Sequence, residues 1–153
     1  MIGDFLGPGS IGLNLTAATK HQALAVTAEI AARCLKSRPS LVLDALLARE
    51  AQGPTGVGHG VAVPHALLPG LRQTSGVFVR LKPAVDYGAV DGAPVDLIFA
   101  LFSPFPGGGD HLQVLARVAR SLRSGNLRQR LRQAATPDLV RALLTFQAQS
   151  DAA

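Results

Sequence analysis

Cysteine and long apolar runs are almost absent from this chain of 153 residues. The single cysteine, Cys34, excludes a disulfide framework and a zinc site built from cysteines. The longest stretch without a charged residue, 51–71, contains three prolines and five glycines, which excludes a membrane-spanning helix. The first residues carry an acid where a secretory signal carries base, and Gly7 and Pro8 interrupt their apolar stretch. We therefore expect a cytoplasmic protein without membrane insertion.

Acidic residues are scarce in the last third of the chain, and this scarcity sets the net charge. Up to Asp110, eight Lys or Arg balance eight Asp or Glu, whereas seven arginines and two acids follow, which gives the net +5. Six of these arginines form a stripe without acids or aromatic residues, which favours a solvated face or a docking face for acidic partners over nucleic-acid binding. The stripe consists of Arg117, Arg120, Arg123, Arg128, Arg130 and Arg132.

The order of the periodic segments predicts a single α/β domain over residues 1–153, with helices on both sides of a sheet. A chain of this length buries about 68–70% of its unfolded surface, so it needs no metal or disulfide to hold its core. Apolar residues at helical spacing and capping residues mark the helices. They are 19–35, capped by Thr19; 40–50; one that Asp110 caps and Gly125 or Asn126 ends; 127–134; and one opened by Thr136 and Pro137.

Two β-rich stretches lie between the second and third predicted helices. The nearly continuous apolar run over 95–102 is typical of a central strand buried on both faces. A second strand is expected over 76–81, and the pair 91–92 (Asp-Gly) predicts a turn between the two. Residues 53–70 are rich in glycine and proline, and they predict a loop interrupted by one short strand over 61–63.

Two histidines occupy positions where anions bind. His65 follows Pro64 at the end of a predicted buried strand, and ligands of open α/β sheets gather at the carboxyl ends of strands. His111 lies in the first turn of its helix, where the dipole favours an anion and a neutral imidazole. Arg49 precedes a loop with alternating glycines, whose N–H groups can approach an anion closely. Together they predict a phosphate site with a nucleophilic imidazole; an alternative is zinc bound by His59, His65 and His111, although no carboxylate ligand is evident nearby.

The residues around His65 carry a more specific signal. Leu-Ala-Arg-Glu at 47–50, followed by Gly-Pro-Thr-Gly-Val-Gly-His-Gly-Val-Ala-Val-Pro-His at 53–65, resembles the phosphorylation-site signature of a bacterial family. This family comprises the type-2 IIA components of the phosphoenolpyruvate-dependent phosphotransferase system, which are fructose, mannitol and nitrogen-regulatory proteins. Residues 90–101 and 110–116 are similar to its second and third blocks. The family fold is a mixed sheet flanked by helices, which agrees with the predicted class.

The resemblance implies a role for individual residues. His65 matches the phosphoryl-accepting histidine, Arg49 the arginine that steadies the phosphoryl group, and His111 the second histidine of the site. Pro54 replaces the serine of the nitrogen-regulatory pattern and removes a backbone donor. His59 replaces an asparagine, and its imidazole would bond the phosphoryl group, shift a neighbouring pKa or face solvent. The expected phosphate loop consists of Thr55, Gly56, Gly58, His59 and Gly60.

The function that the resemblance implies is that of a regulatory phosphocarrier. It would take a phosphoryl group on His65 from a histidine phosphocarrier protein and control partners, such as sensor kinases or transporters, by its phosphorylation state. No metal or other cofactor is implied, and the absence of a P-loop fits a protein donor. The alternatives are a sugar-branch component that passes the group to a IIB domain and a non-catalytic nucleic-acid-binding module. A free-standing unit and the string Asp-Gly-Ala-Pro-Val-Asp-Leu at 91–97 favour the regulatory branch.

Overall fold

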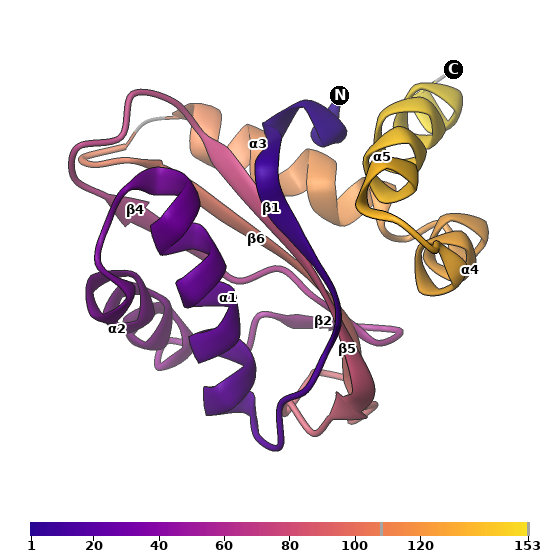
Figure 1. The fold of residues 1–153 in the computed structure, drawn as a ribbon, viewed down its shortest axis with the longest axis horizontal. Coiled ribbons are helices and arrows are strands. Elements are labelled where there is room, and N and C mark those ends of the chain that lie inside the picture. The colour runs from indigo at the N-terminus through magenta and orange to yellow at the C-terminus, as the bar shows by residue number, and fades with distance from the viewer. Residues whose placement is uncertain (108, 153) are drawn as a thin grey trace.

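The computed structural model describes residues 1–107 and 109–152, and within them a six-stranded sheet separates two layers of helices (Figure 1). The strand order is β1-β5-β6-β3-β2, and β4 pairs with the free part of β6. Strands β5 and β6 are antiparallel, whereas β1 runs parallel to β5 and both β3 and β4 run parallel to β6. The sheet is therefore mixed, as expected. The strands are β1 (Leu6–Leu15), β2 (Gly56–Gly58), β3 (Val61–Ala62), β4 (His65–Leu68), β5 (Ser75–Val85) and β6 (Val95–Pro104).

Each face of the sheet has its own hydrophobic core, and β6 supplies side chains to both. Ile98, Ala100 and Phe102 lie in the core beneath α1 (Lys20–Leu35) and α2 (Pro39–Glu50). The alternate residues of the same strand, including Phe99, lie in the core of the opposite face. Successive side chains of a strand point to opposite faces, so an uninterrupted apolar run indicates burial on both sides. Helices on the second face are η1 (Ile2–Phe5), α3 (Gly109–Ser121), α4 (Gly125–Gln133) and α5 (Pro137–Ala152).

The helix starts follow the capping residues at two of the three predicted positions. The Thr19 hydroxyl accepts from the third backbone N–H beyond it, and Thr136 does the same at the start of α5. The prediction for Asp110 was wrong, because α3 begins at Gly109 and Asp110 lies inside its first turn. Aspartate is favoured both as a cap and within the first turn, so its presence alone does not fix the start.

The predicted end of α3 also needs correction. The helix ends at Ser121, and Gly125 is the first residue of α4, which Ser124 caps through its hydroxyl. Arg128 donates to the carbonyls of Leu122 and Arg123 just beyond α3. Gly125 therefore opens α4 and does not end α3.

In the described part of the chain, no helix has both the length and the apolar character that crossing a membrane requires.

Glycine and proline obscured strands in two parts of the sequence. Residues 6–15 contain Pro8 and three glycines, yet they form an edge strand of the sheet, a position in which proline is tolerated. Residues 53–70, predicted as a loop with one strand, contain β2, β3 and β4. As a result, His65 opens β4 and does not simply follow the end of β3.

Candidate functional site

Arg49, His65 and His111 come from three different elements and meet beside strand β4. Arg49 lies in the last turn of α2, His65 is the first residue of β4, and His111 is in the first turn of α3. The Nε–H of Arg49 donates to His65 Nε2 over 3.0 Å. The centroids of the two imidazole rings are 5.6 Å apart. The three residues with the most specific predicted roles therefore form one cluster.

The register between β4 and β6 brings the two histidines to the same face of the sheet. His65 pairs with Leu101, and two residues later Leu67 pairs with Ser103. Ala66 lies in the core beneath α1 and α2, so the alternation of the strand places His65 on the opposite face, which α3 covers. Ser103 shares this face and bonds the His111 ring.

Hydrogen bonds fix the protonation of His65. Its Nδ1 lies 3.0 Å from the carbonyl oxygen of Val63, which can only accept, so Nδ1 carries the proton. Nε2 must then be the unprotonated nitrogen, and it accepts from Arg49. Both ring nitrogens of the neutral imidazole thus have a partner: Nδ1–H bonds the backbone carbonyl, and the lone pair of Nε2 faces the guanidinium. Nε2 is therefore the ring nitrogen that carries the lone pair a nucleophile needs.

The environment keeps both rings of the pair neutral. Burial lowers the pKa of His65 below its ordinary value of 6.5, and the nearby Arg49 guanidinium lowers it further, against opposing effects of the Val63 carbonyl and Glu50. Burial also lowers the pKa of His111, and so does its proximity to His65. An unprotonated His65 is what a nucleophile at pH 7 requires.

These pKa shifts predict how stability depends on pH. Both histidines should titrate at lower pH in the folded protein than in the unfolded chain, where the ordinary value is 6.5. As the pH falls through 6.5 the unfolded chain takes up protons first, so the free energy of unfolding should decrease in this range. NMR titration of the folded and the urea-unfolded protein measures the pKa values directly. Equal titration curves in the two states would contradict the assignment of neutral, buried rings.

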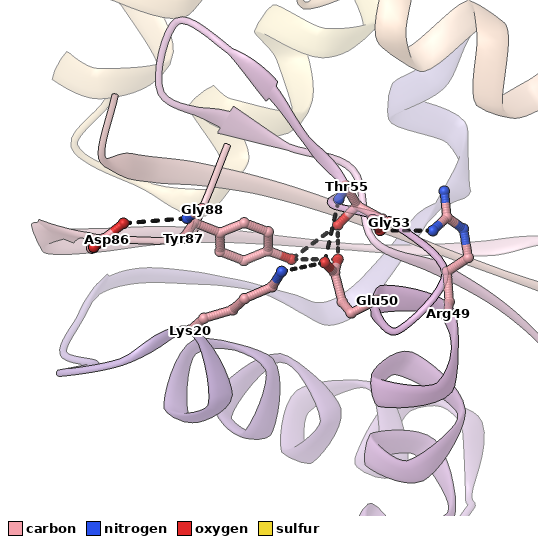
Figure 2. Close-up of polar contacts among 8 residues, drawn as sticks. All are labelled: Lys20, Arg49, Glu50, Gly53, Thr55, Asp86, Tyr87 and Gly88. Atoms are coloured by element: carbon pink, nitrogen blue, oxygen red, sulfur yellow. Dashed lines mark hydrogen bonds and ion pairs between the residues drawn. The ribbon is translucent and has the colours of Figure 1, made fainter. Parts of the chain in front are cut away.

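A buried carboxylate, Glu50, follows Arg49 at the end of α2 and contacts donors from three parts of the chain, Lys20, Thr55 and Tyr87 (Figure 2). Its side chain is only 6% exposed and forms an ion pair with Lys20. It accepts from the Tyr87 hydroxyl over 3.0 Å, from the Thr55 hydroxyl and from the Thr55 backbone N–H over 3.3 Å. Lys20 also lies over the Tyr87 ring, 4.7 Å from its centroid. Burial raises the pKa of Tyr87, so its hydroxyl stays protonated and available as a donor.

The Glu50 cluster connects to His65 through the backbone. Thr55, which Glu50 holds, accepts from the Val63 N–H over 2.9 Å, and the Val63 carbonyl accepts from His65. On the other side, Arg49 Nη1 donates to the carbonyl of Gly53 over 2.9 Å. Glu50 therefore fixes the segment that positions both the arginine and the imidazole. The sequence motif assigns Glu50 no role, because two of its three partners, Lys20 and Tyr87, lie thirty or more residues away in the chain.

Replacing Glu50 with glutamine should destabilise the protein by about 2–3 kcal/mol. Hydrogen bonds to a charged group are strong, and the NH2 group of the glutamine amide would face the donors that now bond the carboxylate. The matched control is Asp44→Asn, the same chemical change at an exposed position of the same helix, for which we expect less than about 0.5 kcal/mol. Urea unfolding measures both differences. Similar losses in the two variants would show that the Glu50 cluster contributes nothing particular.

The predicted phosphate-loop residues have other contacts. The Thr55 hydroxyl is used by Glu50 and Tyr87, and Gly56 to Gly60 form the β2–β3 hairpin. At its tip His59 is exposed, its N–H donates to Asp91 and its carbonyl accepts from Arg132. A Cβ at Gly56 would lie 2.7 Å from that of Ala89, so close packing already requires this glycine.

His111 has a hydrogen-bond partner that was not among the predicted site residues. Its Nδ1 lies 2.5 Å from the hydroxyl of Ser103, which in turn lies 2.9 Å from the hydroxyl of Thr74. His111 and Ser103 are 9% and 2% exposed, so neither can rely on bulk water. Ser103 directly follows the apolar run over 95–102, near the carboxyl end of the strand where ligands of open α/β sheets gather, and this is the signal that could have found it.

The arginine stripe divides into two groups. Arg128 caps the end of α3, and Arg132 binds the Asp96 carboxylate through two nitrogens, so these two arginines stabilise the fold. The side chains of the other four are exposed and have no hydrogen-bond or ion-pair partner among the described residues; they are Arg117, Arg120, Arg123 and Arg130.

Within the described ranges, no three His, Cys, Asp or Glu side chains gather as a metal site requires, so the zinc alternative finds no support.

Comparisons of the sequence and of the structure with known proteins identify the same kind of relative. Residues 4–146 match the family model described as phosphoenolpyruvate-dependent sugar phosphotransferase system, EIIA 2. A nitrogen regulatory protein of Bradyrhizobium diazoefficiens is 43% identical over 86% of this chain and 86% of its own length. A fructose-specific EIIA component of Haloferax volcanii is 38% identical over 67% of the chain and 66% of its own length. The crystal structure of the nitrogen regulatory protein IIA-Ntr from Neisseria meningitidis superimposes with a TM-score of 0.87 and 34% identity, covering 94% of this chain and 98% of that one.

Proposed function

Because the chain belongs to the EIIA type 2 family of the phosphoenolpyruvate-dependent sugar phosphotransferase system, we propose that it is a regulatory phosphocarrier of the nitrogen-regulatory type. The phosphoryl donor is a histidine phosphocarrier protein, and the acceptor is Nε2 of His65. The observation that carries this proposal is the pair of bonds on the His65 ring, which leave an unprotonated nitrogen beside a guanidinium. Such a protein works in the cytoplasm, where its donor is phosphorylated.

The transfer is a displacement at phosphorus. The lone pair of His65 Nε2 forms the new N–P bond while the bond to the donor's imidazole nitrogen breaks, and that nitrogen keeps the electron pair. The proton on His65 Nδ1 stays in place, hydrogen-bonded to the Val63 carbonyl, which stabilises the positive charge that develops on the ring. Neither a metal nor a nucleotide enters this balance. Catalysis rests on alignment and on neutralising the equatorial oxygens.

Arg49 and His111 would stabilise these oxygens. Once Nε2 is bonded to phosphorus it no longer accepts from Arg49, so the Nε–H of the guanidinium becomes available to a phosphoryl oxygen. The Nη1 bond to Gly53 holds the side chain in position during this exchange. His111, whose ring centroid lies 5.6 Å from that of His65, would be the second group to stabilise the phosphoryl oxygens.

Regulation of partners is favoured over onward transfer to a sugar transporter. The nitrogen regulatory relative is similar over 86% of this chain, the fructose-specific one over 67%. A phosphoryl group would add nearly two negative charges near the exposed Arg117, which lines the same pocket as His111, and this changes the attraction for an acidic partner. The regulated proteins, such as sensor kinases or transporters, would thus bind the two phosphorylation states differently.

Phosphorylation by a purified donor tests this function. The chain is incubated with a histidine phosphocarrier protein, the enzyme that charges it and phosphoenolpyruvate, and its intact mass is measured. We expect one phosphoryl group, located on His65 by fragmentation at alkaline pH. No mass increase, or a phosphoryl group elsewhere, would contradict the proposal. Rapid onward transfer to a fructose- or mannitol-type IIB domain would instead assign the chain to the sugar branch.

A further inference from the structure

The hydroxyls of Thr74 and Ser103 form a buried chain that ends on the second histidine of the site. Thr74 Oγ1 lies 2.9 Å from Ser103 Oγ, and Ser103 Oγ lies 2.5 Å from His111 Nδ1. The three residues come from separate parts of the fold: the segment before β5, the end of β6 and the start of α3. All three line a cavity of about 790 Å³; Thr74 is half-buried, whereas Ser103 and His111 are buried.

Each hydroxyl has a single proton, so the chain can run in only two directions. If Ser103 donates to His111, Nδ1 is unprotonated, Nε2 carries the hydrogen of the neutral ring, and Thr74 donates to Ser103. If Ser103 donates to Thr74, His111 must donate from Nδ1, and its Nε2 then presents a lone pair. The two directions give His111 opposite properties toward anything that lies at Nε2.

We propose that Ser103, supported by Thr74, is a positioning residue that holds His111 as the Nε2–H tautomer and so makes it a hydrogen-bond donor to the phosphoryl group on His65. This inference rests on the proposed function, because a phosphoryl oxygen only accepts and a lone pair facing it would repel it. The two histidines then carry opposite tautomers: Nδ1–H at His65, set by Val63, and Nε2–H at His111, set by Ser103.

The burial of the pair explains why a hydroxyl is used at this position. Ser103 is 2% exposed and His111 9% exposed, so water does not replace a missing partner of Nδ1 easily. An acidic residue in place of Ser103 would accept from Nδ1–H and favour the wrong tautomer or a charged ring. A hydroxyl that itself receives a bond from Thr74 keeps its own hydrogen directed at the ring.

The tautomer can be measured without any phosphoryl transfer. In the ¹⁵N NMR spectrum of the unphosphorylated protein at pH 8, His111 should show a protonated Nε2 and a hydrogen-bonded, unprotonated Nδ1. In Ser103→Ala the Nδ1 resonance should move to the position of a nitrogen without a hydrogen bond. A protonated Nδ1 in the native protein overturns the proposal, whatever the outcome of the phosphorylation experiment.

The transfer reaction supplies the second readout. We expect Ser103→Ala to slow the transfer step about tenfold, the factor that one ordinary hydrogen bond represents, with unchanged affinity for the donor protein. Ser103→Thr keeps the hydroxyl and should restore the rate, and Thr74→Val should slow the step about two- to threefold. The control is Ser121→Ala, which removes a buried hydroxyl at the last residue of α3, ten residues after His111, and should react at the native rate.

The results distinguish a failure of the proposed role of Ser103 from a failure of the proposed phosphocarrier function. An unchanged rate and an unchanged His111 spectrum in Ser103→Ala overturn the positioning role, even if His65 is phosphorylated normally. If Ser103→Ala does not fold, the Thr74→Val spectrum decides: a retained Nε2–H tautomer with a weakened Nδ1 bond supports the chain, and an identical spectrum and rate contradict it. Failure of native His65 to take up phosphate contradicts the proposed function but leaves the spectrum as a test of the hydrogen bond.

Discussion

Replacing His65 with alanine is expected to abolish phosphoryl uptake, lowering the rate by at least about 10³-fold, as the loss of a catalytic nucleophile does in other enzymes. Nε2 of His65 is the unprotonated nitrogen that lies beside Arg49, and no other described side chain shares this arrangement. The Nδ1 of His111 is bonded to Ser103 and buried, so it cannot substitute. Incorporation is measured by intact mass after incubation with the charged carrier protein.

Two further variants test whether another histidine accepts the phosphoryl group. His21→Ala changes an exposed histidine on α1 and should take up phosphate at the native rate. His59→Ala removes the exposed imidazole at the tip of the β2–β3 hairpin, where Asp91 and Arg132 hold only the backbone of this residue. We expect a change of less than about threefold for it, because its ring has no contact that would position a phosphoryl group. Full uptake by His65→Ala, or complete loss in His59→Ala, would contradict the assignment of the acceptor.

The residues that carry the proposed chemistry could be selected from the sequence because each stands at a recognisable position. Arg49 ends a helix, His65 follows a buried apolar segment, and His111 opens a helix after a glycine-rich loop. Their meeting in space depends on the parallel pairing of β4 with β6, which periodicity does not reveal. The resemblance to a family supplied this missing step.

The residues that orient the site were missed for a physical reason. Glu50, Tyr87 and Lys20 are separated by thirty or more residues along the chain, and only the packing of α1 against α2 and the sheet unites them. Ser103 and Thr74 are ordinary hydroxyl residues whose role follows from the register of β6 with its neighbours. Local patterns identify groups that react, whereas the groups that orient them depend on tertiary contacts.

The glycine-rich segment shows how one pattern has two physical explanations. Alternating glycines predict a backbone cradle for an anion, but here Gly58 and Gly60 have positive φ angles of 105° and 81° within a hairpin. A Cβ at Gly60 would lie 2.8 Å from the Asp96 carboxylate, which Arg132 also binds. The glycines are therefore required by the turn and by close packing, independently of any phosphate.

Arg49→Ala is expected to lower the transfer rate by about 10²–10³-fold, the usual consequence of removing one donor that stabilises transition-state charge. The change also removes the hydrogen bond to the Gly53 carbonyl, but the Glu50 cluster remains and should keep the fold intact. Rapid-quench measurement of the single-turnover transfer from the charged carrier gives the rate. Arg33→Ala, an exposed arginine on α1, is the matched control and should react at the native rate.

A second readout distinguishes a direct role of Arg49 from a loss of structure. The guanidinium lowers the pKa of His65, so its removal should raise this pKa toward 6.5 and move the acid limb of the pH–rate profile to higher pH. Arg49→Lys keeps a positive charge but loses the planar fork, so it should preserve the profile while still transferring about tenfold more slowly than the native protein. A structural defect would instead lower the rate equally at every pH. Native transfer kinetics in Arg49→Ala would remove this residue from the site and leave His65 activated by burial and the Val63 carbonyl alone.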